Sequence, residues 1–196
     1  MPWVPMGAIM VLAVGLRWLA FSLFDITHAD ELMQYVEQGH RLAFGYGLVP
    51  WEYRYGIRSL LVPELLAAPM IIARWLTDAP FAPLIAGRTL FAGLCLLAVP
   101  AAFWLGSLQS RLHGLVAMFV AALWFEAVLL GVQVLTESLA TATGCAGTAA
   151  LLAARDNRRA AILGGFLLAL TVLLRFQYAA YAGPLALMVL GRDRAA

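Results

Sequence analysis

The sequence contains no lysine, only two cysteines and few charged residues of either sign. All 13 of its basic residues are arginines, and charged residues make up 12% of the chain, against roughly 25% in a soluble domain. Because the arginines are scattered and the formal net charge is only +2, no nucleic-acid partner is predicted. Cys95 and Cys145 lie inside apolar runs, so neither a disulfide nor a metal site is implied.

Apolar residues, by contrast, make up 63% of the sequence, which indicates an all-α membrane protein. The first apolar stretch lacks a small-residue cleavage site, so we expect a retained helix rather than a removed signal peptide. Six stretches are apolar enough to span a bilayer: Met6–Phe24, Ala82–Leu105, Gly114–Val134, Thr136–Ala154, Ala160–Leu174 and Phe176–Leu190.

A seventh apolar run, Ser59–Leu76, contains two prolines, a glutamate and an arginine, which makes a poor lipid-exposed span. The most arginine-rich short segments lie at 111–113, 155–159 and 192–194, and cytoplasmic loops are enriched in arginine. If all three segments face the cytoplasm, the span Ala82–Leu105 must run inward. If Met6–Phe24 runs outward, residues 25–80 must then lie outside, which is possible only if Ser59–Leu76 does not cross the membrane. We therefore predict a juxtamembrane helix or re-entrant segment there, within a single transmembrane domain over 1–196.

The predicted external loop, 25–80, holds most of the acidic side chains. Its first part predicts a helix, with Thr27 as N-cap and Asp30 at the third helical position. The next part is rich in glycine and aromatic residues, which can form an interfacial belt or flat faces for a sugar ring; composition alone favours the belt. Seven of the eleven acidic residues lie in this loop: Asp25, Asp30, Glu31, Glu37, Glu52, Glu64 and Asp78.

Several short motifs in this loop resemble the N-terminal signature of the glycosyltransferase family 22 mannosyltransferases. These enzymes add mannose to GPI anchors and lipid-linked oligosaccharides. The chain departs from the family pattern at two positions, where Ala29 replaces a proline and Pro50 replaces a threonine, but neither change removes a charged group. The matching motifs are His28-Ala-Asp30-Glu31, Gln34-Tyr35, Trp51-Glu52-Tyr53, Arg58-Ser59 with Pro63, and Leu135-Thr-Glu137-Ser138.

The resemblance implies the N-terminal part of a GT-C fold, a transmembrane helix bundle whose large first external loop contains juxtamembrane helices. It implies transfer of a sugar, expected to be mannose, from a polyprenyl-phosphate carrier to a hydroxyl of a glycan or glycolipid, with inversion. The lipid-linked sugar would be a substrate, and no cofactor or metal is expected. The expected location is the bacterial inner membrane or the endoplasmic reticulum, with the active face external or lumenal. Members of the family are longer than this chain.

The resemblance also suggests the residues that carry the chemistry. The acceptor hydroxyl must lose its proton as it attacks, and a nearby carboxylate can serve as general base. The family pattern assigns this role to Asp30, whereas helical spacing alone favours a capping carboxylate in the first turn. Glu31 points about 100° away on a helix and is expected to orient the acceptor or the chain.

The departing lipid phosphate needs cations, and arginine suits phosphate because its planar fork matches the oxygens. Arg58, Arg88 and Arg175 are the candidates, although each can instead snorkel to the headgroups. Substrate contacts are also expected for His28, Trp51, Glu52 and Glu137, with a solvated loop glutamate as the alternative for Glu52. His28 and His40 have no third ligand in the pattern, so a metal site is not favoured.

Charged residues inside the predicted spans suggest a buried polar layer. Arg17, Arg88 and Glu126 lie at about 9–12 Å below the predicted outer boundary, at 1.5 Å per residue. Charges at that depth normally pair or line a wet cavity. We therefore predict that Glu126 faces Arg17 or Arg88.

Two other classes of function remain open from the sequence. A non-catalytic membrane subunit of the same fold would need no free carboxylate. A transporter or lipid-carrier flippase would place polar groups at broken helices near the midplane. The acidic residues here gather in the external loop instead, which counts against transport.

Overall fold

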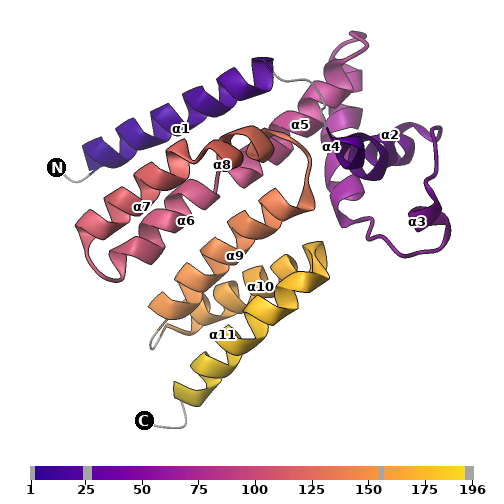
Figure 1. Cartoon of the computed structure of the whole chain (residues 1–196). Helices are drawn as coiled ribbons and strands as arrows, with labels where there is room; N and C mark the ends of the chain where they lie inside the picture. The colour runs from indigo at the N-terminus through magenta and orange to yellow at the C-terminus, as the bar shows by residue number, and fades with distance from the viewer. Residues whose placement is uncertain (1–2, 24–27, 155–156, 193–196) are drawn as a thin grey trace.

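The computed structural model describes residues 3–23, 28–154 and 157–192, and these residues form helices and no strands (Figure 1). The all-α fold predicted from composition is therefore confirmed. The helices at the N-terminal end are α1 (Trp3–Leu23), the π-helical segment η1 (Glu31–Val36), α2 (Glu37–Phe44), α3 (Trp51–Arg54) and α4 (Leu61–Leu76). The central helices are α5 (Ala82–Cys95), α6 (Ala98–Ser107), α7 (Arg111–Leu123), α8 (Phe125–Leu129) and the 3₁₀ turn η2 (Leu130–Val132). The C-terminal helices are α9 (Thr136–Ala153), α10 (Arg158–Leu174), the 3₁₀ turn η3 (Phe176–Tyr178) and α11 (Ala179–Arg192).

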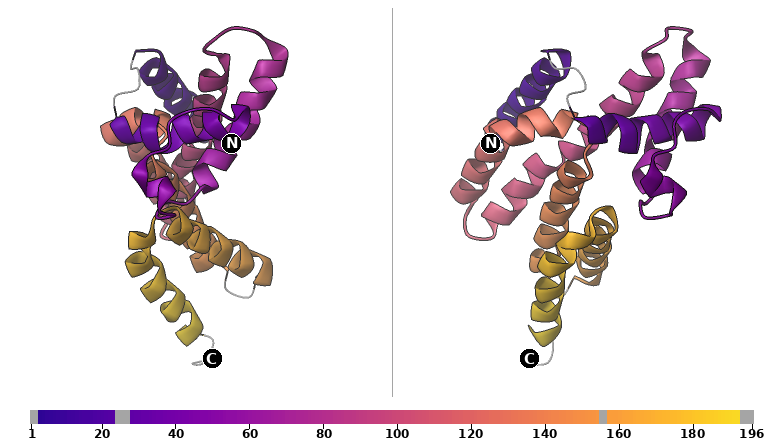
Figure 2. Two further views of the ribbon diagram at one scale, coloured as in Figure 1. Left: turned by 90° about the vertical axis from the view of Figure 1, so that its right-hand side faces the viewer. Right: turned by 45° about the vertical axis from the view of Figure 1, so that its right-hand side comes forward.

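The helices pack mainly as consecutive pairs, α4 with α5, α6 with α7 and α9 with α10, and contacts between sequence-distant helices join these pairs. Helix α1 lies along α7, and α6 contacts α9 (Figure 1). Helices α4 and α5 form a hairpin against which η1 and α2 pack. In both views of Figure 2, α11 extends away from the region formed by η1 to α4. The helix formed by η1 and α2, here called the acidic loop helix, therefore meets the bundle at the end where α5 and α9 contact each other.

Fewer helices suit a membrane span than the six predicted. In the described residues, α1 and the continuous 26-residue helix 82–107 formed by α5 and α6 are long and apolar enough to cross a membrane. The pair formed by α7 and the segment 125–132 counts as a third span only if its 60° bend is ignored. Helices form at the predicted positions of α9, α10 and α11, but these fall short of the same length and apolarity. Helix α4, predicted not to cross, is not among the candidate spans.

Two irregularities interrupt the central helices. Pro100 has no N–H and its ring crowds the Leu96 carbonyl, so the helix tightens into i→i+3 bonds such as Leu97 N–H to Leu94 O, 3.2 Å. At Trp124 the backbone leaves the helical region, with φ −54° and ψ 115°, and α7 ends. The predicted span Gly114–Val134 is therefore two helices rather than one.

Helix ends show the expected caps. Ser110 accepts the His113 N–H at the start of α7, and Asn157 accepts two N–H groups at the start of α10. Helix α2 ends at Gly45, whose φ of 83° is a left-handed conformation that glycine adopts without strain, and its N–H donates to Arg41 O. This turn redirects the chain, so that residues 46–58 fold back beside the helix.

The central core binds the acidic loop to the bundle. Tyr35 and Val36 of the loop helix pack with residues of α4, α5 and α9 in one buried cluster. Gly39 permits the close approach of α2 to α4, since a Cβ there would lie 2.9 Å from Leu66 Cβ. The rest of this cluster is Val62, Leu66, Met70, Phe91, Cys95, Val134, Leu139, Ala140 and Leu174.

Candidate active site

Asp30 and Glu31 begin the loop helix, yet their side chains have opposite environments. Asp30 is exposed, and its side chain makes no hydrogen bond or ion pair with the described residues. Glu31 is fully buried and accepts hydrogen bonds from Arg88 Nε at 3.1 Å and from the Val134 N–H at 3.0 Å. Asp30 thus stands at the surface beside a residue that fixes the helix to two other elements. Thr27, the expected N-cap, lies outside the described residues.

Arg88 completes this anchor from α5. Its guanidinium lies 4.9 Å from the centre of the Phe21 ring of α1, and its side chain is 8% exposed. Burial raises the pKa of the Glu31 carboxyl, while the Val134 hydrogen bond and the Arg88 charge act in the opposite direction. Arg88 is therefore engaged in an internal ion pair, and Glu31 has no surface from which to touch a substrate.

Polar side chains at helical spacing form the buried face of this helix. Gln34 is 8% exposed and Gln38 is fully buried, at positions three and seven residues after Glu31. Gln34 Nε2 donates to Glu52 Oε1 at 3.3 Å, and Gln38 Nε2 donates to Leu48 O at 2.9 Å. The side chains of the acidic helix therefore hold the loop that carries Glu52.

Tyr53 adds a further contact to the same helix. Its hydroxyl donates to the Gln34 carbonyl, and burial raises the pKa of Tyr53 to about 12. The phenol therefore stays protonated at neutral pH and remains a donor. Trp51, two residues earlier and expected to contact sugar, is 61% exposed.

A chain of side chains connects the loop to the ends of α9 and α10. Arg58 Nη1 donates to Tyr35 Oη at 3.3 Å, and that hydroxyl is hydrogen-bonded to Thr136 Oγ1 at 2.9 Å. Thr136 Oγ1 also lies 3.2 Å from Glu137 Oε2, whose carboxylate pairs with Arg175. Three predicted site residues, distant in sequence, are thus brought into one network: Arg58, Glu137 and Arg175.

The network depends on two residues that sequence reasoning did not select as site residues, Tyr35 and Thr136. The buried face formed by Glu31, Gln34, Tyr35 and Gln38 gives a signal that could have revealed Tyr35, whereas Thr136 lies on α9, outside this pattern. Polar residues that repeat every three or four positions usually form the solvent-facing side of a helix. Here Glu31, Gln34 and Gln38 repeat in this way, yet all three are buried.

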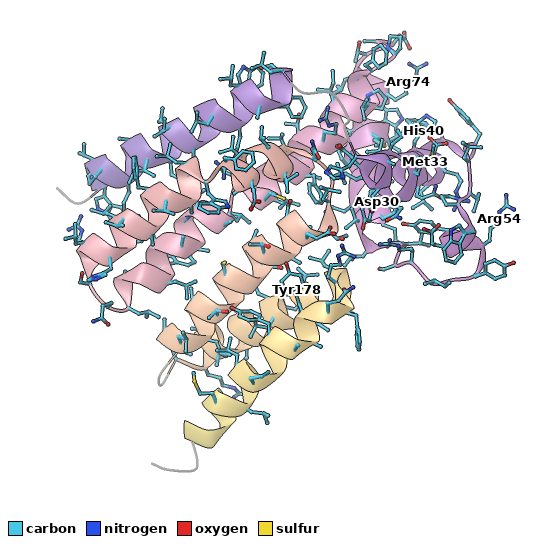
Figure 3. All side chains as sticks on the ribbon, viewed as in Figure 1. Asp30, Met33, His40, Arg54, Arg74 and Tyr178 are labelled. Atoms are coloured by element: carbon cyan, nitrogen blue, oxygen red, sulfur yellow. The ribbon has the colours of Figure 1, made fainter. Side chains whose placement is uncertain are left out.

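The positions of the labelled side chains agree with this arrangement. Figure 3 shows Asp30 on the side of the loop region nearer to the ends of α9 and α10, whereas Arg54 lies at its outer tip. His28 is exposed, and its side chain takes part in no hydrogen bond with the described residues. Within the described part of the chain, no group of three His, Cys, Asp or Glu side chains could hold a metal ion.

The predicted pairing of Glu126 with Arg17 or Arg88 is wrong. Arg88 pairs with Glu31, and Arg17 donates to the Ala122 and Ala121 carbonyls at 3.2 and 3.3 Å. The helix break at Trp124 explains the difference, because it leaves the last carbonyls of α7 without intrahelical donors. Exposed Glu126 instead accepts from the Trp124 indole at 3.2 Å.

The chemical capacity of the site lies in an exposed carboxylate on an anchored helix, with half-buried cations nearby. Asp30 can accept a proton from a hydroxyl group brought to the surface beside it. Arg58 and Arg175 are both partly exposed, so they can meet an anion without leaving their hydrogen-bonded positions.

Known proteins resemble this chain over the same region. The sequence model of the Alg9-like mannosyltransferase family matches residues 8–195. GPI mannosyltransferase 3 of Trypanosoma brucei brucei is 31% identical over 113 residues, which cover 57% of this chain and 20% of that protein. Alpha-1,2-mannosyltransferase alg9 of Schizosaccharomyces pombe is 44% identical over 68 residues, 34% of this chain and 12% of that protein.

A shorter match is closer in sequence. The mannosyltransferase APTG1 of Arabidopsis thaliana is 53% identical over 38 residues, 19% of this chain and 7% of that protein. The aligned parts span a fifth or less of the length of each of these relatives. No solved structure matches the chain.

Proposed function

Because this chain belongs to the Alg9-like mannosyltransferase family, we propose that the protein transfers mannose from a polyprenyl-phosphate carrier to a hydroxyl of a glycan or glycolipid. The proposed transfer takes place at the outer or lumenal face of the membrane and inverts the anomeric centre. The lipid-linked sugar is the donor substrate, and the proposal requires no metal or cofactor.

The contrast between Asp30 and Glu31 is the observation that carries this proposal. Only one of two adjacent carboxylates is exposed, and the buried one is bonded to α5 and to the segment before α9. A general base must be accessible and must also be held in position. The Glu31 anchor supplies the second condition for Asp30.

In the proposed reaction, Asp30 accepts the proton of the acceptor hydroxyl as its oxygen attacks the anomeric carbon. The new carbon–oxygen bond forms on the face opposite the phosphate. The bond from the anomeric carbon to the phosphate oxygen breaks, and its electron pair leaves with the lipid phosphate. Arg58 and Arg175 are half-buried cations that belong to the network and can oppose the phosphate charge.

The test is the Asp30→Asn variant, assayed for transfer of radiolabelled mannose from polyprenyl-phosphate mannose to a glycolipid acceptor. Loss of a positioned general base is expected to lower the rate by about 10²–10⁴. Glu64→Gln is the matched control, because Glu64 is an exposed carboxylate in the same loop, at the start of α4.

Both variants should keep the unfolding midpoint of the original chain, because neither side chain is buried. Turnover by Asp30→Asn at the rate of the Glu64→Gln control would contradict the assignment of the base. That result would favour a helix-capping role for Asp30, whereas absence of transfer by the original chain would favour a non-catalytic subunit of the same fold.

A further inference from the structure

Arg17 is a buried cation whose only hydrogen bonds are to backbone carbonyls. It is 5% exposed and donates to Ala13 O at 3.3 Å as well as to the two carbonyls at the end of α7. Among the described residues no carboxylate lies within ion-pair distance of its guanidinium, and its Nε has no partner. A buried charge without a counter-ion is costly, which points to an anionic ligand.

Two cavities are both lined by Arg17. The first is a crevice of about 230 Å³ beside the α7–α8 break, and its polar lining is Arg17, Trp124, Glu126, Glu137, Ser138 and Thr141. The second is an apolar groove of about 170 Å³ between α1 and α5, and its lining includes Arg17, Val14, Trp18, Phe21, Ala92 and Leu96. Arg17 therefore lies at the junction of an apolar groove and a crevice that has polar side chains among apolar ones.

The polar crevice suits a sugar phosphate better than a simple anion. Arg17 supplies one positive charge, while the exposed Glu126 carboxylate would oppose a bare anion; the Glu137 carboxylate is paired with Arg175. Sugar hydroxyls are donors, however, and the two carboxylates together with Ser138 and Thr141 can accept from them. Trp124, which is 57% exposed, offers an aromatic face to a ring.

The crevice also adjoins the candidate active site. Glu137 lines it, and the same carboxylate is joined through Thr136 and Tyr35 to the helix that begins with Asp30. A headgroup in the crevice would thus contact a hydrogen-bond network that reaches the helix carrying the proposed base.

We propose that Arg17 binds the phosphate of the lipid-linked sugar donor, with the sugar in the crevice and the first part of the polyprenyl chain in the groove between α1 and α5. This inference rests on the proposed function, because it places the donor of that reaction. It names a residue outside the external loop, on a helix that carries none of the sequence motifs of the loop.

Gly131 gives a second way to perturb the junction. It lines the crevice, and a Cβ built on it would contact only Arg17 Nε, at 3.8 Å. That distance is ordinary van der Waals contact, so Gly131→Ala should fold normally while filling the space beside the unpartnered nitrogen.

The experiment measures binding without turnover, using the full chain in detergent micelles. Farnesyl phosphate is titrated while tryptophan fluorescence is recorded, since Trp18 lines the groove and Trp124 lines the crevice. Farnesol, which lacks the phosphate, and inorganic phosphate, which lacks the chain, are titrated in parallel. Farnesyl phosphate should bind at least about tenfold more tightly than either.

Arg17→Gln should weaken farnesyl phosphate binding by about tenfold or more and leave farnesol binding unchanged. Gly131→Ala should weaken it in the same direction, and Arg111→Gln, an exposed arginine at the far end of α7, should have no effect. If Arg17→Gln does not fold, the Gly131→Ala result decides.

Equal binding of farnesyl phosphate and farnesol would overturn the proposal, as would unchanged affinity in a folded Arg17→Gln protein or, failing that, in Gly131→Ala. Binding of inorganic phosphate as tight as that of farnesyl phosphate would also overturn it, by showing a free-phosphate site. Asp30→Asn should bind farnesyl phosphate normally. Loss of turnover in that variant together with normal binding by Arg17→Gln would therefore reject this inference and leave the proposed function standing.

Discussion

The acidic loop helix is joined to the bundle by a buried ion pair, whereas the buried contacts among α9, α10 and α11 are made by small residues and hydroxyl groups, and their Glu137–Arg175 ion pair is partly exposed. In the first region, Glu31 and Arg88 meet at 3.1 Å with almost no exposure of either side chain. In the second, Gly147 and Gly164 let α9 and α10 approach closely, and Thr143 bonds Thr171 at 2.8 Å.

The two kinds of contact differ in whether they fix the rotation of a helix about its axis. An ion pair with a fixed hydrogen-bond geometry determines how a helix is rotated, and here it turns Asp30 outward. Glycine contacts and hydroxyl bonds hold helices close together without orienting any charged group, as is common between membrane helices. The first region is therefore built to position a site, and the second to hold the bundle.

The largest expected effect comes from breaking the ion pair. Glu31→Gln leaves Arg88 buried without a counter-charge and should destabilise the protein by about 3–5 kcal/mol. The free energy of unfolding can be measured by titrating the protein in detergent micelles with SDS. The double variant Glu31→Leu with Arg88→Leu should be milder than either single leucine change. Additive losses in the double variant would show that the two side chains do not act as a pair.

The second expected effect comes from separating α9 and α10. A Cβ at Gly164 would lie 2.8 Å from Leu151 N and 2.9 Å from Gly147 O, so Gly164→Ala forces backbone apart. Destabilisation of about 1–3 kcal/mol is expected. The neighbour Gly165 has nothing within 4 Å of such a Cβ, and Gly165→Ala in the same denaturation series should be neutral or stabilising.

The third expected effect lies where the two regions meet. Tyr35→Phe removes the hydroxyl that bonds both Thr136 and Arg58 and should cost about 1 kcal/mol. Because the ring stays in the core, the dependence of the free energy of unfolding on SDS concentration should not change. If this hydroxyl links the two regions, the transfer rate should fall while Glu31–Arg88 remains paired, and a rate equal to the original would argue against the link.

The smallest expected effect is in the hydroxyl contacts of the bundle. Thr171→Val removes the bond to Thr143 and keeps the volume, with an expected loss of about 0.6 kcal/mol. The affinity for farnesyl phosphate and the rate of mannose transfer should not change. A loss as large as that of Glu31→Gln would remove the distinction drawn between the two regions.

Much of the fold was predictable from local patterns. Composition indicated a helical membrane protein, and the apolar runs marked where most helices form. The helix break at Trp124 was not predicted, because neither proline nor glycine lies there and the run 114–134 is uniformly apolar around Glu126. That break decided the partner of Arg17, since it freed the carbonyls of Ala121 and Ala122.

The sequence by itself determined the class of protein, the gathering of carboxylates in the first loop and the motifs shared with the mannosyltransferase family. These are properties of composition and of neighbours in the chain. Only the tertiary structure decided which carboxylate is exposed and which residues are joined. Glu31 and Arg88 are 57 positions apart, and Tyr35 and Thr136 are 101 apart. Pairing over such separations depends on how helices pack and rotate, which no local pattern specifies.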